Sequence, residues 1–207
     1  MNPERLTGSS AAPQCEEISP ADMRRRQILD AAGACFARRG FHGASMAEIA
    51  RTFGMSAGHI YNYFASKEAI IEALVERDLE TALDRIDELR SAAEIHQAMV
   101  AGVAEGVQNT VARSSLDLEI VAEAARNPGV AATVRSMDAA LRARLKEVVG
   151  TIYPASAQVE ERELEAKIEL MLAIFDGLTV RVVRNPDFDR DGVVREVQWI
   201  VREMFGE

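Results

Sequence analysis

The amino-acid sequence predicts an all-α protein, on the strength of its composition and its pattern of apolar residues. Hydrophobic residues make up 48% and charged residues 28% of the 207 residues, which gives a globular chain with enough apolar side chains for a core. Aromatic residues reach only 5%, and 13 glycines and 6 prolines are too few for a many-stranded β protein with repeated turns. The surplus of Ala, Glu, Arg and Leu is typical of helices.

The first predicted helix follows an N-terminal tail. Residues 1–20 are rich in Ser, Ala, Pro, Gly and Glu and have no periodicity, which predicts a mobile tail. A helix begins at Asp22, and its apolar side chains recur along one face, at Ile28, Ala32, Cys35 and Phe36. Gly40 stands where a C-terminal glycine cap ends a helix.

Two short helices come next, each with a serine cap. Ser45 and Glu48 have the spacing of a capping box, in which the serine caps a free amide and the glutamate reaches back. This helix ends before Gly54, and Ser56 caps a second short helix that carries Ile60. Because helices this short are unstable alone, we expect both to pack on the first helix and on the segment that follows.

The remaining sequence predicts six further helices, for about nine in all. Ser66 caps a long helix, and the next two cover about 92–112 and 115–126. Asn127-Pro128 is a strong helix start, with asparagine as the cap and proline at the first helical position. Another helix covers about 158–183, and Asn185-Pro186 separates it from the last one.

The stretch from Ala50 to Ile60 has the spacing of a helix-turn-helix. Ala50 is small enough for the first helix to approach the second, and Gly54 fits a turn that passes through positive φ. Ile60 is the branched apolar residue that anchors the second helix. Taken alone, this pattern also fits a short helical hairpin with no role in DNA binding.

The pattern extends well beyond these three positions. Residues 24–74 closely resemble the DNA-binding head of the TetR family of bacterial regulators. The matching positions are the apolar face from Ile28 to Phe36, Gly40, Ser45, Ile49-Ala50, Gly54, Ser56, Gly58, Ile60-Tyr61, Tyr63-Phe64 and Ser66-Lys67-Glu68. Beyond residue 90 the resemblance is one of size and helix order, with a weaker match at Phe175-Asp176-Gly177-Leu178. It implies a homodimer that binds a double-stranded DNA operator and a small-molecule effector.

Residue chemistry and the resemblance assign the same DNA contacts. They are small or polar residues on and around the two short helices: Ser45, Ser56, Ala57, Gly58, His59, Tyr61, Asn62, Tyr63 and Lys67. Ala57 and Gly58 let the backbone approach the bases, and His59 and Asn62 carry groups that read base edges. The tyrosine hydroxyls, Lys67 and the helix start at residue 45 suit phosphates, which position a protein without specifying sequence.

Three of these assignments have a simpler alternative. Tyr61 and its neighbour Phe64 could pack between the head and the helix that follows. His59 could be a solvated surface histidine, and Lys67 an ordinary surface lysine.

The charge distribution agrees with DNA binding at one end of the molecule. The whole chain carries a net charge of −9, which argues against indiscriminate binding to nucleic acid. Residues 21–67, however, contain seven Lys and Arg against three Asp and Glu, a net charge of +4. We therefore expect a DNA-binding domain at 21–67 and an acidic effector-binding and dimerisation domain at 68–207.

Candidates for the effector pocket and the dimer interface follow from the resemblance and from shared helix faces. The pocket candidates are Met99, Val103, Val107, Glu119, Glu123, Met137, Leu141 and Phe175. The interface candidates are Leu172, Phe175, Val193, Val197, Ile200, Val201 and Met204. Each apolar residue among the pocket candidates also fits an ordinary core. Gly102 and Gly106 weaken a helix interior by about 1 kcal/mol each, which indicates close helix contact or space left for a ligand.

Other classes of protein have little support. The three histidines lie on different elements, and no nucleophile elbow, P-loop or dinucleotide motif is present, so we expect no metal, no cofactor and no enzyme activity. Cys15 and Cys35 suggest free thiols, and the apolar runs are too short for a membrane span, which predicts a cytoplasmic protein. We therefore expect a homodimeric repressor that a small molecule releases from a palindromic operator. The alternatives are a helical ligand-binding or adaptor protein with a non-functional head, or a small all-α enzyme.

Overall fold

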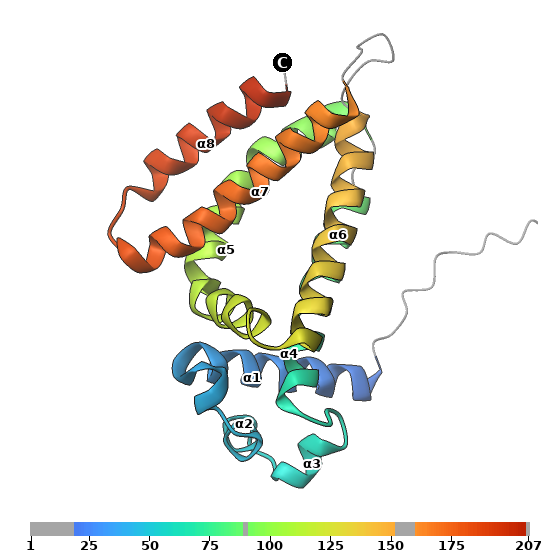
Figure 1. Cartoon of the computed structure of the whole chain (residues 1–207), viewed down its shortest axis with the longest axis vertical. Coiled ribbons are helices and arrows are strands. Elements are labelled where there is room, and N and C mark those ends of the chain that lie inside the picture. Colours follow the sequence, from blue (N-terminus) through green and yellow to red (C-terminus); the bar gives the residue numbers. More distant parts are fainter. Residues whose placement is uncertain (1–18, 89–90, 152–159, 206–207) are drawn as a thin grey trace, which may run out of the picture.

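The computed structural model describes residues 19–88, 91–151 and 160–205, and within them the chain forms eight α-helices and no strand (Figure 1). The helices are α1 (Pro20–Gly43), α2 (Met46–Phe53), α3 (Ala57–Tyr61), α4 (Lys67–Asp87), α5 (Ala92–Ala124), α6 (Pro128–Gly150), α7 (Glu161–Arg184) and α8 (Arg190–Phe205). The all-α prediction is confirmed. The predicted break near residues 112–115 is wrong: α5 continues through this stretch. Ser114 and Leu116 are buried there, so the stretch is part of the packed helix. Most of the predicted tail lies outside the described residues.

Helix α1 is interrupted at Gly40, where the sequence predicts its end. Ser19 caps the start of α1 by accepting a hydrogen bond from the Asp22 amide at 3.1 Å. Gly40 has φ 73° and ψ 162°, a conformation that residues with a side chain rarely adopt. The regular helix therefore stops at Gly40, and the turn that follows carries Phe41 into the core with 2% of its surface exposed.

The first core joins α1, α2, α3 and the first half of α4. Its fully buried large side chains are Ile28, Phe36, Ile49, Ile60, Ile70, Ile71 and Leu74. The same core continues to Leu116 and Ile120 of α5 and Val130 of α6. The predicted DNA-binding domain therefore packs directly on the body, and α4, which begins at Lys67, contributes to both parts.

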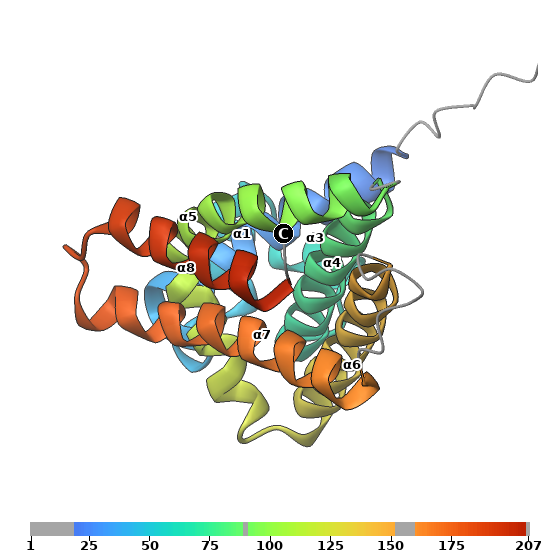
Figure 2. The same ribbon diagram turned by 90° about the horizontal axis from the view of Figure 1, so that it is seen from above.

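The second core lies among α5, α6, α7 and α8. Its buried residues are Val103, Val107, Val149, Leu164, Ile168, Val197, Val201 and Phe205. In Figure 1, α5, α6 and α7 form the sides of a triangle above the head, and Figure 2 shows the same helices from above. Helix α8 packs against α5, and α4 packs against α6. Helix α3 lies at the opposite end of the molecule from this second core (Figure 1).

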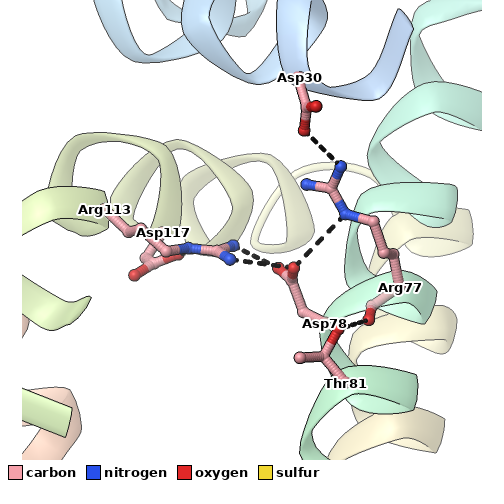
Figure 3. Close-up of polar contacts among 6 residues, drawn as sticks. All are labelled: Asp30, Arg77, Asp78, Thr81, Arg113 and Asp117. Atoms are coloured by element: carbon pink, nitrogen blue, oxygen red, sulfur yellow. Dashed lines mark hydrogen bonds and ion pairs between the residues drawn. The ribbon is translucent and has the colours of Figure 1, made fainter. Parts of the chain in front are cut away.

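A polar network joins α1, α4 and α5 (Figure 3). Arg113 of α5 donates hydrogen bonds to both carboxylate oxygens of Asp78 on α4. The neighbouring Arg77 donates from Nη1 to Oδ1 of Asp30 on α1 at 2.7 Å. Asp117 lies one turn after Arg113, with its Oδ1 3.7 Å from Nη2 of that arginine. Because a two-pronged arginine–carboxylate pair fixes both partners, this network holds α4 and α5 in one relative position.

The network predicts a pH-dependent effect at Asp117. Burial raises the pKa of the Asp117 carboxyl above its ordinary value, with Arg113 opposing the rise and Asp78 and Asp176 adding to it. A raised pKa means that the ionised form is disfavoured in the folded protein, so ionisation of Asp117 costs stability at neutral pH and protonation at low pH removes that cost. We expect Asp117→Asn to raise the midpoint of thermal unfolding at pH 7 by about 1–3 °C.

The control for this prediction is the same measurement at low pH. The difference between Asp117→Asn and wild type should shrink as the pH is lowered into the acidic range, because protonation of the carboxyl removes the cost of burying its charge. An unchanged or lower midpoint at pH 7 would show that the ion pair with Arg113 outweighs the cost of burial.

Candidate nucleic-acid interface

The helix-turn-helix consists of α2, α3 and the turn at Gly54. Ser45 caps α2 by accepting a hydrogen bond from the Glu48 amide at 3.2 Å, as predicted. The Glu48 carboxylate instead pairs with Arg39 of α1, with 2.7 Å between Oε1 and Nε, so the second half of the predicted capping box gives way to a contact between helices. Gly54 has φ 80° and ψ 27°, the left-handed conformation that the sequence predicts for this turn.

Helix α3 is held to the core by one fully buried side chain. Ser56 caps α3 by accepting a hydrogen bond from a backbone amide of the helix at 3.3 Å. Ile60 is 0% exposed and packs in the head core. Gly58, Tyr61 and Asn62 are exposed to solvent, and Tyr61 keeps 53% of its surface accessible. These residues form a surface that no other part of the described chain covers.

The other predicted contacts on this segment are half-buried beside that surface. The ring centroids of His59 and Tyr63 lie 5.7 Å apart, and Tyr63 and Ala57 pack partly against the head core. Phe64 is only 3% exposed, so the packing alternative holds for Phe64. Tyr61, by contrast, keeps about half of its surface exposed to solvent.

Lys67 is fixed by the protein itself. Its Nζ donates hydrogen bonds to the carbonyl oxygens of Phe41 and Ala44, both at 2.8 Å, and lies 4.6 Å from the centroid of the Phe41 ring. These carbonyls belong to the turn that follows the helix break at Gly40. Two of the three donors of the ammonium group are therefore used to hold the end of α1.

Comparison with known proteins identifies this arrangement. The family model of bacterial regulatory proteins of the TetR family matches residues 28–74, and the model of the C-terminal region of BetI-type transcriptional repressors matches residues 92–205. The chain belongs to the TetR family.

Relatives of this TetR-family chain agree with the assignment over most of its length. The transcriptional regulator UidR of Escherichia coli K12 is 37% identical over 194 residues, which cover 90% of this chain and 93% of UidR. The regulator BetI of Escherichia coli O139:H28 is 33% identical over 134 residues, 64% of this chain and 65% of BetI. The structure of GusR from Salmonella enterica superposes with a TM-score of 0.70 at 26% identity, and the match covers 91% of this chain and 98% of GusR.

The TetR-family protein is a helix-turn-helix transcriptional regulator, and members of the family bind DNA and small-molecule effectors. This membership excludes the enzyme alternative. Among the helices of residues 19–88, 91–151 and 160–205, none combines the length and apolar character that a membrane span requires.

Three arginines of α1 add positive charge to this TetR-family head, and two of them lie against aromatic rings of the helix-turn-helix segment. The Arg24 guanidinium lies 5.7 Å from the centroid of the Phe53 ring, at the end of α2. The Arg25 guanidinium lies 4.7 Å from the centroid of the Phe64 ring, just after α3. Arg26 follows them, and all three side chains are exposed. Cation–π contacts therefore hold two of these charges next to the helix-turn-helix.

Two predicted pocket residues lie at the junction between α5 and the head. Glu119 accepts a hydrogen bond at Oε2 from the Phe41 amide at 2.9 Å. Glu123 is 4% exposed, and its Oε2 lies 3.2 Å from Nε2 of His42. The helix break in α1 places both partners within reach of α5. The two glutamates of α5 thus contact the end of α1, and neither lines the cavity between α4, α5, α6 and α7.

A cavity of about 470 Å³ lies between α4, α5, α6 and α7. Of the predicted pocket residues, Met99, Val103 and Phe175 line it. Val107 is 1% exposed in the body core, and Met137 and Leu141 lie on α6 outside the described lining. The cavity therefore brings together three of the eight predicted residues.

Most of the predicted dimer residues face their own chain. Val197 and Val201 are 6% and 1% exposed in the body core. Others pack partly against that core: Leu172, Phe175, Val193 and Met204. Ile200 is half-buried. The large apolar side chains that α7 and α8 expose are different ones: Leu170, Val180, Val183 and Trp199.

Proposed function

We propose that this regulator is a homodimeric repressor that binds a palindromic operator and is released from it by a small molecule. The observation that carries the proposal is the geometry of α3, which is capped by Ser56, anchored by Ile60 and exposed at Tyr61. Helix α3 also lies at the free end of the head (Figure 1), where a DNA duplex can reach it. The family membership and the similarity to UidR support the same function.

The residues on and beside α3 have two roles: some contact bases, and the small ones let the backbone come close to the bases. The N-terminal end of a recognition helix enters the major groove. No atom lies within 4 Å of the position that a Cβ would take at Gly58, so the backbone of Gly58 and the small Ala57 can come near the bases. Asn62 is exposed and can pair with adenine, and His59 lies half-buried beside it and can reach a base edge.

Phosphate contacts position the head on the duplex. Tyr61 and Tyr63 supply hydroxyls on either side of Asn62. Ser45 marks the N-terminus of α2, where free amides and the helix dipole favour an anion. Lys67 keeps one ammonium donor for a phosphate while its other two hold the end of α1.

The proposed dimer uses the exposed face of α7 together with Trp199 of α8. Leu170, Ala173, Gly177 and Val180 recur at helical spacing along α7, and all four are exposed. The two small residues allow a second copy of α7 to approach closely. A two-fold dimer would place two α3 helices on successive turns of one face of the DNA and would present two basic heads.

Helix α5 supplies a connection between effector and operator. It lines the cavity with Met99 and Val103 and holds the head through Glu119. Its Arg113 also fixes Asp78 of α4, the helix that belongs to the head core and packs against α6 of the body. A ligand that favours a different position of α5 and α4 therefore changes the orientation of the head, and ligand and operator weaken each other's binding by the same factor.

The proposal is tested by fluorescence anisotropy with DNA from just upstream of the gene, at two salt concentrations. Tyr61→Phe removes one hydroxyl from an exposed side chain and should weaken operator binding about 2- to 10-fold. Asn62→Ala removes a base contact and should weaken it about 5- to 100-fold. Both residues are exposed, so the thermal unfolding midpoint should not change.

The control variant is Gln108→Ala, an exposed substitution on α5 far along the chain from α3. We expect it to bind the operator as wild type does. Wild-type binding should fall steeply with salt, as counterion release requires. If genome-wide selection recovers no DNA bound more tightly than random sequence, the head does not bind DNA and the protein is the ligand-binding or adaptor alternative.

A further inference from the structure

The two glycines in the middle of α5 have different structural roles. A Cβ at Gly106 would lie 2.6 Å from Cε1 of Phe175, so the close approach of this ring to α5 requires glycine. A Cβ at Gly102 would meet nothing within 4 Å, and Gly102 lines the cavity. Glycine destabilises a helix interior, and at Gly102 no neighbouring group accounts for its presence. What Gly102 provides is open space.

The wall around Gly102 is apolar except at one edge. The larger apolar side chains come from all four helices, and they include Ile86 of α4 with Met99, Val103, Leu145, Met171 and Phe175. The polar groups of the described lining are Arg85 of α4 and Glu105 and Asn109 of α5. A bound molecule would therefore contact hydrocarbon over most of its surface and polar atoms on one side only.

The polar edge carries no unpaired charge among the described lining residues. Arg85 and Glu105 neutralise each other, with 2.8 Å between Nη2 and Oε1, and both side chains are more than half exposed. Asn109 offers an amide that can both donate and accept a hydrogen bond. A sugar would exchange many hydrogen bonds with water for few partners, and an ionic ligand would have to compete with the Arg85–Glu105 pair for a countercharge, so an uncharged and largely apolar molecule fits the lining best.

We propose that the cavity binds an uncharged amphipathic small molecule, with its apolar body over Gly102 and one hydrogen-bonding group towards Asn109. The volume of about 470 Å³ lies within the range of small-molecule sites, roughly 300–1,000 Å³. Gly102 is the residue that determines the length of the apolar body, because any larger side chain there occupies the ligand's place. The inference rests on the proposed function, since it names the effector class of the same regulator.

The test uses the fluorescence of N-phenyl-1-naphthylamine, an uncharged apolar probe, with the full-length protein in the absence of DNA. Wild type should bind the probe, Gly102→Ala should bind it more weakly, and Gly102→Leu should lose at least about tenfold in affinity because its side chain fills the cavity. Leucine is also the better helix former, so the unfolding midpoint of Gly102→Leu should rise by about 2–4 °C. A rise in stability together with a loss of binding separates a filled cavity from a damaged fold.

The matched control is Ala101→Leu, which adds the same side chain at the preceding position; both positions are exposed, but only Gly102 lines the cavity. It should bind the probe as wild type does. In competition, 1-decanol should displace the probe and methyl β-D-glucoside should not. The inference is overturned if Gly102→Leu binds the probe within twofold of wild type, or if the glucoside displaces it as well as decanol does.

Operator binding is measured separately, so the two proposals can fail separately. If Gly102→Leu loses the probe while no form of the protein binds DNA, the cavity inference stands and the repressor proposal fails. If the operator is bound and the probe titrations of Gly102→Leu and wild type coincide, the repressor proposal stands and the cavity inference fails.

Discussion

Replacement of Ile60 by alanine is expected to weaken operator binding by about 30-fold or more while the body of the protein stays folded. Ile60 is the single buried residue of α3, and it is 0% exposed. Truncation of such a side chain costs about 2–5 kcal/mol. Because α3 has five residues, it is too short to persist as a helix without that anchor. The free energy that orders α3 then has to be taken from DNA binding, and operator affinity falls by about 30-fold or more.

Circular dichroism and anisotropy together check this prediction. The variant should keep most of its helical signal, since α3 is a small part of the helical residues, and should lose operator affinity at a temperature below its unfolding transition. Ile168→Ala is the matched control, because Ile168 is 2% exposed in the body core and far from α3. It should lower the unfolding midpoint comparably and leave operator affinity within about threefold. Equal losses of affinity in both variants would show that general instability, and not the position of α3, is responsible.

The head was predictable because its signals are local in the sequence. Ser45 and Ser56 each cap an amide three residues away, and Gly54 carries its own backbone requirement. The break at Gly40 follows from the same rule, since a positive φ can be expected wherever glycine ends an apolar face. Such contacts need no knowledge of the rest of the fold.

The partners of charged residues were not predictable because they are distant in the chain. Lys67 bonds to carbonyls 23 and 26 residues away, and Glu119 to an amide 78 residues away. Glu119 was a candidate for the effector pocket, but its hydrogen-bond partner is the end of α1, and it does not line the cavity. The prediction that a helix ends near residue 112 was wrong for the same reason. Arg113 and Leu116 keep α5 continuous through contacts with Asp78 and with the head core.

Apolar periodicity also could not tell a core face from an interface. Helix α8 has a broad apolar face that predicts burial, and Val197 and Val201 do lie buried against their own chain. The exposed Trp199 lies between them in the sequence and points elsewhere. The residues available for contact with a second copy are therefore the few large apolar ones that lie outside this buried face.

Because Trp199 is exposed while its apolar neighbours on α8 are buried, a substitution at Trp199 should have a large effect on the dimer. We expect Trp199→Glu to convert the proposed dimer into a monomer and to lower operator affinity. Trp199 is 56% exposed on α8. Truncation of a tryptophan that is buried in an interface costs about 2–4 kcal/mol of binding free energy. Near a two-fold axis the introduced carboxylate would also repel its symmetry mate. The dimer dissociation constant should therefore rise by at least about 30-fold, as sedimentation equilibrium would measure.

Two further variants decide whether the exposed face or the buried face of α8 makes the dimer. Val121→Glu adds the same charge to another exposed apolar residue, 61% exposed on α5, and should leave the dimer intact. Val201→Ala truncates a residue that is 1% exposed and predicted from periodicity to lie in the interface. It should lower the unfolding midpoint without changing the dissociation constant, because its neighbours belong to its own chain. A dimer weakened by Val201→Ala and untouched by Trp199→Glu would place the interface on the buried face, which requires α8 to leave its contact with α5 before two copies associate.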